Sequence, residues 1–177
     1  MQLIHMPLHH PALDELLHHL RAIYQNGGAE FARFQVVDCS LHEWFTTRTR
    51  QDELPFILNV LNNPTVISAF PVLRAQAPLK ADPRIEPSSA LTLDGELAQV
   101  LVQGGAYTQF SGTGSEAKAI GQRFCQALFS DRYTDMQIYK SSTAWSEWFG
   151  DVMWDCTWFG LDLHENQVWI LSVTDTD

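Results

Sequence analysis

Hydrophobic residues in the first part of the chain recur at intervals of three or four, which is the spacing of one helix face. The pattern begins after His10-Pro11 and ends at Asn26-Gly27-Gly28, so it predicts a first helix between these points. Apolar and polar positions then alternate over residues 31–39, as in a half-buried strand. The run Ser-Leu-His-Glu at 40–43 matches a capping box and predicts that a short helix follows.

The middle of the chain contains further helical and extended patterns around a proline-rich stretch. Half of the eight prolines fall between Pro71 and Pro87. Because proline fixes φ and cannot donate to a β-ladder, an irregular loop is expected at about 71–90. A helix is expected at 93–103, although Asp94-Gly95 leaves a hairpin open as the alternative. The other predicted elements are helices from Leu41, from Asp52 and from Ser115, strands at 65–70, 106–110 and 136–140, and one or two helical turns at 143–149.

The last part of the chain predicts a long β-hairpin, formed by residues 152–162 and 167–174 with a turn at 163–166. In this register apolar residues face apolar residues, hydroxyl residues face each other, and a glycine leaves room for an indole. A shift by one residue would move every side chain to the opposite face. Both faces are apolar near the turn, so these strands are expected in the centre of a sheet that is covered on both sides. The predicted pairs are Asp162 with Gln167, Leu161 with Val168, Gly160 with Trp169, Phe159 with Ile170, Trp158 with Leu171, Thr157 with Ser172, Cys156 with Val173 and Asp155 with Thr174.

This order of elements predicts an α+β fold, in which a mostly antiparallel sheet ends in the C-terminal hairpin and helices pack on the sheet. The 177 residues fit a single globular domain over 1–177, which at this length buries enough surface to fold without a disulfide or a metal. The loop at about 71–90 is interpreted as part of that domain and not as a linker, because neither flanking half shows a separate core.

Composition and charge limit the compartment and the partners. The chain has 11 Lys and Arg against 21 Asp and Glu, for a formal charge of −10. This charge repels nucleic-acid phosphates and anionic lipids, so neither nucleic acid nor membrane is an expected partner. Residues 1–8 lack the pattern of a signal peptide, and no apolar run reaches ~20 residues. With three cysteines and no CxxC spacing, we expect a soluble cytoplasmic protein with reduced thiols and with neither a metal nor a cofactor.

The strongest functional candidate is the segment 131–177, which is both aromatic and acidic. It contains five of the six tryptophans, and nine carboxylates against two cations, a balance of −7. Such a composition is typical of protein interfaces, where Trp and Tyr dominate the binding energy, and it suits a basic partner. The alternative is that the indoles fill a core and the carboxylates solvate its edge. The candidate partner-binding residues are Trp145, Trp148, Asp151, Trp154, Asp155 and Asp175.

We therefore expect a non-enzymatic protein whose partner is another protein or a second copy of the chain. The alternative is a small-molecule-binding domain or an enzyme with an anion site at the turn before the helix at Ser115, where backbone amides could hold a phosphate or a carboxylate. That turn lacks the Gly-Lys-Ser/Thr of a P-loop, and the sequence has no nucleophile elbow. The residues of this alternative site are Gly112, Thr113, Gly114 and Ser115.

Overall fold

A six-stranded antiparallel sheet forms the centre of the protein, in the part of the chain that the computed structural model describes, residues 1–47 and 53–177. The strand order is β1-β2-β6-β5-β4-β3, so the hairpin strands β5 and β6 lie in the middle. This arrangement confirms the predicted α+β class with a C-terminal hairpin. The strands are β1 (Leu3–His5), β2 (Gly28–Val36), β3 (Glu86–Ser88), β4 (Met136–Ser141), β5 (Cys156–Asp162) and β6 (Gln167–Thr174).

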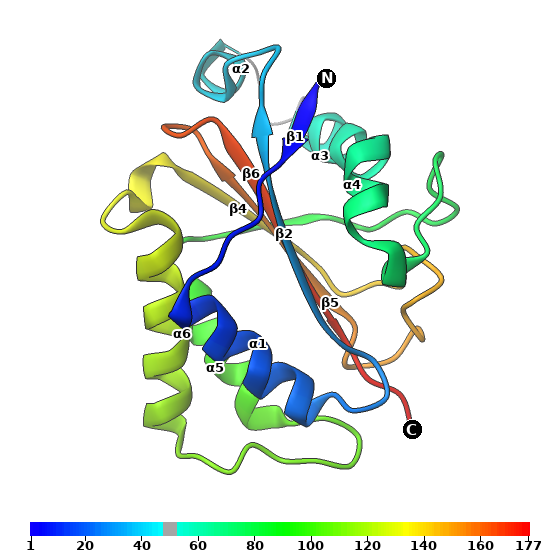
Figure 1. Cartoon of the computed structure of the whole chain (residues 1–177), viewed down its shortest axis with the longest axis vertical. Coiled ribbons are helices and arrows are strands. Elements are labelled where there is room, and N and C mark those ends of the chain that lie inside the picture. Colours follow the sequence, from blue (N-terminus) through cyan, green and yellow to red (C-terminus); the bar gives the residue numbers. More distant parts are fainter. Residues whose placement is uncertain (48–52) are drawn as a thin grey trace.

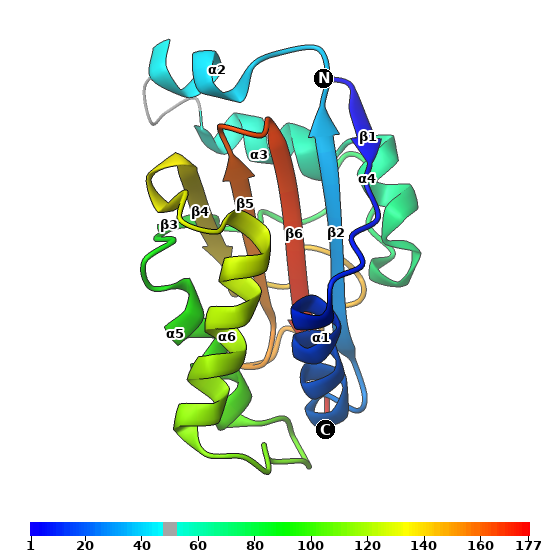
Figure 2. The ribbon, with the colours of Figure 1, turned by 60° about the vertical axis from the view of Figure 1, so that its left-hand side comes forward.

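Helices cover both faces of the sheet (Figure 1 and Figure 2). On one face lie α1 (Pro11–Ile23), α5 (Leu93–Gln103) and α6 (Gly114–Phe129). On the other lie α2 (Leu41–Thr47), α3 (Glu53–Leu61) and α4 (Pro64–Ala69). Two short 3-10 helices, η2 (Pro71–Leu73) and η3 (Tyr133–Asp135), complete the described elements. None of the described helices has both the length and the hydrophobicity that a membrane span requires.

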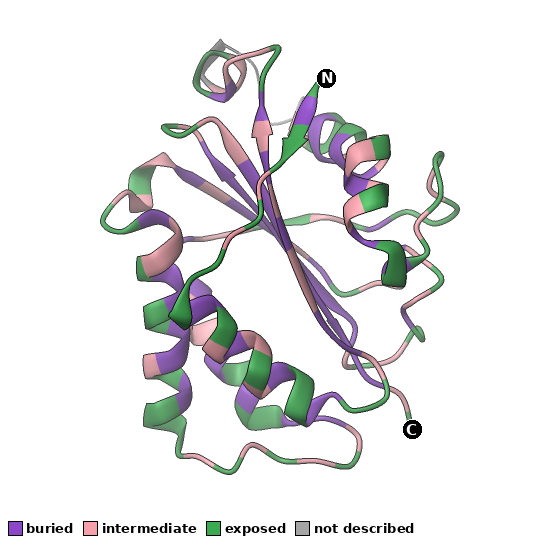
Figure 3. Cartoon of the chain, viewed as in Figure 1, coloured by how far each residue is buried: buried purple, intermediate pink, exposed green. Residues whose placement is uncertain are grey.

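Each sheet face has its own hydrophobic core, because side chains alternate along the two central strands. Trp158 and Trp169 belong to the core under α1, α5 and α6. Their neighbours Phe159 and Ile170 belong to the core under α2, α3 and α4. Every residue of β5 is buried, and Figure 3 shows the central strands buried along most of their length. The prediction that these strands are covered on both sides is therefore confirmed.

The predicted hairpin register is confirmed at every pair from Cys156 with Val173 to Asp162 with Gln167. Gly160 lies opposite Trp169, and a Cβ atom at position 160 would overlap the indole ring. The indole packs against Phe31 and Phe124, at ring-centroid distances of 6.3 and 6.1 Å. The absence of a side chain at Gly160 thus decides where the largest side chain of this core can lie.

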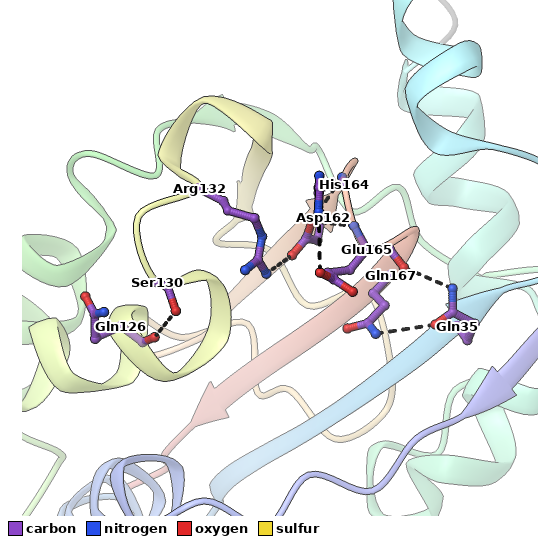
Figure 4. A network of polar contacts seen from close by, with 8 residues as sticks. All are labelled: Gln35, Gln126, Ser130, Arg132, Asp162, His164, Glu165 and Gln167. Atoms are coloured by element: carbon purple, nitrogen blue, oxygen red, sulfur yellow. Dashed lines mark hydrogen bonds and ion pairs between the residues drawn. The ribbon is translucent and has the colours of Figure 1, made fainter.

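A polar network closes the hairpin at its turn (Figure 4). Asp162 is buried, and its Oδ1 accepts hydrogen bonds from the backbone N–H groups of His164 and Glu165. Its Oδ2 accepts from Arg132 Nη2 at 2.7 Å. On the neighbouring strand, Gln35 Nε2 donates to the carbonyl of Glu165 at 3.0 Å. The turn is therefore fixed by side chains from both halves of the sheet.

Three predicted strand or helix segments differ from the structure. Residues 65–70 lie in α4 and its C-cap, because Asn63 accepts a hydrogen bond from Thr65 N and Pro64 occupies the first helical position. This cap overrides the strand preference of the β-branched residues that follow. Residues 106–110 have no regular structure, and 143–149 form a turn without a helix. The helix expected from Ser115 has Thr113 as its N-cap.

The remaining predictions are confirmed with shifted boundaries. The helices expected after His10-Pro11 and from Leu41 are α1 and α2, the helix at 93–103 is α5, and no hairpin forms at Asp94-Gly95. The expected start at Asp52 lies outside the described residues, and α3 is described from Glu53. Most of the proline-rich loop is irregular, and its last proline, Pro87, lies in β3 at the edge of the sheet, where a missing N–H costs least.

Candidate functional site

The six candidate partner-binding residues separate into a buried group and a partly exposed group. Trp145 and Asp155 are each 2% exposed, and Asp175 is 1% exposed. Trp148 and Trp154 are half-buried, and Asp151 is exposed. Trp145, Asp155 and Asp175 are therefore too buried for the predicted direct contact with a partner.

The two buried carboxylates bind the backbone of the protein itself. Asp175 accepts from Asn26 N at 2.9 Å through Oδ1 and from Ala106 N at 2.8 Å through Oδ2. It thereby joins the α1–β2 turn and the loop after α5 to the end of β6. Asp155 accepts from Val152 N at 3.0 Å and from the Thr174 hydroxyl at 2.5 Å. A buried carboxylate with two such donors stabilises the segments that it connects.

Trp145 is likewise part of the interior. Its indole Nε1 donates to Thr157 Oγ1 at 3.0 Å, and Thr157 in turn contacts Ser172 Oγ at 3.1 Å. The ring lies 5.3 Å from that of Phe149, between centroids. For this residue the alternative interpretation, an indole that fills a core, is the correct one.

A partly exposed surface remains where the chain enters β5. We call it the hairpin-end surface and define it by Asp151, Met153 and Trp154, whereas Trp148 packs against the core on the other face of the sheet. Met153 is 85% exposed, the highest value among the exposed large hydrophobic residues of the described chain. The sequence prediction missed Met153 because a lone methionine in a loop gives no pattern, although it lies within the aromatic segment.

A cavity of 190 Å³ opens beside the hairpin-end surface. Aromatic and apolar side chains form much of its wall, and a lysine and a thiol are its reactive groups. The residues that matter for its chemistry are Tyr24, Lys140, Met153, Trp154, Asp155 and Cys156.

The ionisable groups in this cavity are neutral or already have partners. Burial raises the pKa of the Cys156 thiol to about 12, so the thiol is neutral and a poor nucleophile. Both oxygens of Asp155 already accept hydrogen bonds. The Lys140 ammonium lies 5.4 Å from the centroid of the Trp158 ring and 3.7 Å from Glu96 Oε2, so its charge is largely balanced.

The buried thiols provide a first testable prediction. Burial raises the pKa of both Cys125 and Cys156 to about 12, whereas an unfolded cysteine titrates near 8.5. At pH 8.5 we expect iodoacetamide to modify these two thiols slower in the folded protein than in urea, by a factor on the order of 10³ from the thiolate fraction alone. Mass spectrometry of digested protein measures each site separately.

The same pKa shift determines how the contribution of the two thiols to the stability of the fold changes with pH. The folded state holds the thiol protons more tightly, so this contribution to stability is complete below pH ~8.5 and is lost as the pH rises toward 12. Equal rates of Cys156 modification in the folded and unfolded protein would contradict the burial described here.

The turn proposed as the alternative anion site is occupied by a side chain of the protein. Thr113 and Glu116 form a reciprocal capping box at the start of α6. Glu116 Oε2 accepts from Thr113 N at 2.6 Å, and this bond holds the pKa of the Glu116 carboxyl below its ordinary value. An anion bound at Gly112–Ser115 would have to displace this carboxylate from the Thr113 amide.

Comparison with known proteins adds no assignment to these observations. No protein-family model matches the chain, and no curated protein matches it significantly.

Proposed function

We propose that this protein is a non-enzymatic binding protein that recognises another protein through the hairpin-end surface. The observation on which the proposal depends is the exposure of Met153, which is 85% exposed beside the half-buried Trp154. Methionine adapts its shape to a partner, and tryptophan is enriched among residues that dominate binding energy. Large apolar side chains that gather on a surface are typical of interaction sites.

The adjacent cavity supports this proposal. Its volume of 190 Å³ and its mixed wall, in which Tyr24 and Trp154 lie beside polar residues, are suited to one side chain of the partner that has both an apolar part and a polar end. Anchoring side chains that fill such pockets supply much of the affinity of protein complexes. The partner would then cover Met153 and place one anchor beside Trp154 and Tyr24.

The charge around the surface favours a partner with basic residues at the rim of the contact. Asp151 and Asp177 are both exposed. They belong to neighbouring segments, because a Cβ at Gly150 would lie 3.0 Å from the Thr176 methyl group. Asp155 and Asp175 are engaged internally. The negative charge that a partner can contact therefore comes from Asp151 and Asp177, and its contribution to binding is modest.

The proposal is tested with a photoreactive amino acid at position 153 in the full chain. Leu91 is the matched control, because it is 74% exposed and does not line the cavity. We expect one protein to be crosslinked from position 153 and not from position 91. The crosslinked protein is then purified, and its affinity is measured by calorimetry for the wild type and for the Met153→Asp and Leu91→Asp variants.

A loss of affinity of about tenfold or more in Met153→Asp, with no change in Leu91→Asp, would support the proposal. If the crosslinked species is a second copy of the chain, sedimentation at increasing concentration should show a dimer that Met153→Asp abolishes. Identical crosslinking from both positions, or equal affinities of the two variants, would refute it.

A further inference from the structure

A second cavity is formed by the loop that follows η2 and by residues 144–147, and its lining includes two cations. It has a volume of 150 Å³, and its lining includes Arg74, Lys80, Trp145, Ser146 and Glu147. We call it the Arg74 pocket. Loops of this length without regular structure are usually functional in compact domains, and residues 74–85 form such a loop.

The charge of this loop is opposite to that of the protein. Arg74, Lys80 and Arg84 are three of the 11 cations of a chain whose net charge is −10, and Asp82 is the one carboxylate between 74 and 85. Such a concentration of positive charge in an acidic protein attracts anions locally.

Within the pocket, two cations accompany one carboxylate, and only one of them is paired with it. Lys80 Nζ lies 2.5 Å from Glu147 Oε1. The Lys80 ammonium, and to a smaller extent the Arg74 guanidinium, lower the pKa of the Glu147 carboxyl, so both positive groups lie close to it. The Arg74 guanidinium has no ion pair or hydrogen bond among the described residues. The pocket therefore has an excess of one positive charge.

A buried hydroxyl in the pocket also lacks a partner. Ser146 Oγ is inaccessible to solvent and has no hydrogen-bond partner among the described residues. Leaving such a group unpaired costs about 1–3 kcal/mol, which an acceptor oxygen would remove.

The backbone holds Arg74 in a conformation that arginine adopts at a cost. Its φ is 50°, in the left-handed region where glycine is favoured and other residues are strained. The loop around it is fixed, because Leu79 N donates to Asn62 Oδ1 at 2.9 Å and the Ser141 hydroxyl donates to the Pro83 carbonyl. The backbone position from which the exposed Arg74 side chain extends is thus determined by the fold.

We propose that the Arg74 pocket binds a phosphate group, either as inorganic phosphate or as a phosphomonoester. A volume of 150 Å³ is about five times the ~30 Å³ that one water molecule occupies in the liquid, which suits the five heavy atoms of this oxyanion. Its several acceptor oxygens match the charged donor groups of Arg74 and Lys80, and the Ser146 hydroxyl would join them after a rotation of its side chain toward the pocket. The organic part of a monoester would lie outside the pocket.

The test is a titration of the ¹⁵N-labelled full chain with inorganic phosphate, O-phosphoserine and acetate, followed by NMR. We expect saturable shifts at the amides of Ala81, Ala144 and Ser146 with one or both phosphates. A response to inorganic phosphate alone identifies the free anion as the ligand, whereas tighter binding of phosphoserine identifies a monoester. Acetate that binds as tightly as either phosphate would overturn the assignment.

Two arginine variants distinguish a loss of phosphate binding from a loss of folding. Arg74→Gly removes the guanidinium and also relieves the strained backbone, so we expect phosphate affinity to fall about tenfold or more without a loss of stability. Arg84→Gly is the matched control, because Arg84 also has a positive φ, 44°, and does not line the pocket. An equal loss of affinity in both variants would show a diffuse charge effect and overturn the proposed site.

A third variant tests the competing carboxylate. Glu147→Gln removes the negative charge beside the two cations, so phosphate affinity is expected to rise severalfold. If neither the wild type nor Glu147→Gln shows a saturable shift, the pocket does not bind phosphate.

Discussion

A Gly160→Ala protein is expected to be less stable than the wild type by about 3 kcal/mol, because the new methyl group would overlap the Trp169 indole. The indole cannot move aside easily, since it is 2% exposed and lies between Phe31 and Phe124. Urea unfolding followed by circular dichroism measures the change in the free energy of unfolding.

Gly95→Ala is the matched control for this substitution. Gly95 lies inside α5, and a Cβ there would meet the end of the flexible Lys118 side chain at 3.2 Å. Gly95 is in the first turn of α5, where the preference for alanine over glycine is smaller than in a helix interior, so this variant should differ from the wild type by less than about 1 kcal/mol. A change of less than 1 kcal/mol in Gly160→Ala would show that the two strands separate or that the indole rotates at little cost.

An Asp175→Asn protein is expected to lose about 2 kcal/mol of stability. Both carboxylate oxygens of Asp175 accept backbone N–H groups, from Asn26 and from Ala106. Asparagine keeps the shape but replaces one acceptor by an NH₂ group, so two donors would face each other and one buried N–H would lose its bond.

Asp177→Asn is the control variant for the loss of stability expected in Asp175→Asn. Asp177 is exposed and lies two residues further along the chain, so its substitution should change the stability by less than about 0.5 kcal/mol. If the two variants unfold at the same urea concentration, the internal role of Asp175 described here is wrong.

The hairpin was the element that sequence reasoning predicted best, and the reason is physical. Its two strands are joined by a short turn, so one assumption about the turn fixes every pair, and the compatibility of Gly160 with Trp169 tests that assumption. The helix α4 was missed because Thr, Val and Ile favour strands, whereas the Asn63 cap and Pro64 determine the structure.

The site residues were predicted less well, because their exposure depends on distant parts of the chain. The donors to Asp175 lie 149 and 69 residues away in sequence. No local pattern reveals such partners, so an aspartate that binds backbone looks the same as one that faces solvent. The Arg74 pocket was missed for the same reason, since Lys80 and Glu147 are 67 residues apart.

The strand order has a consequence for how the protein is made. β6 is synthesised after the other five described strands of the sheet, yet it lies between β2 and β5. Until it is synthesised, the β1–β2 pair and the β3–β4–β5 unit cannot join, and apolar strand edges in both remain unpaired. We therefore expect a nascent chain that depends on holding chaperones, and a refolding rate limited by contacts such as Gly28 with Thr174 that span most of the sequence.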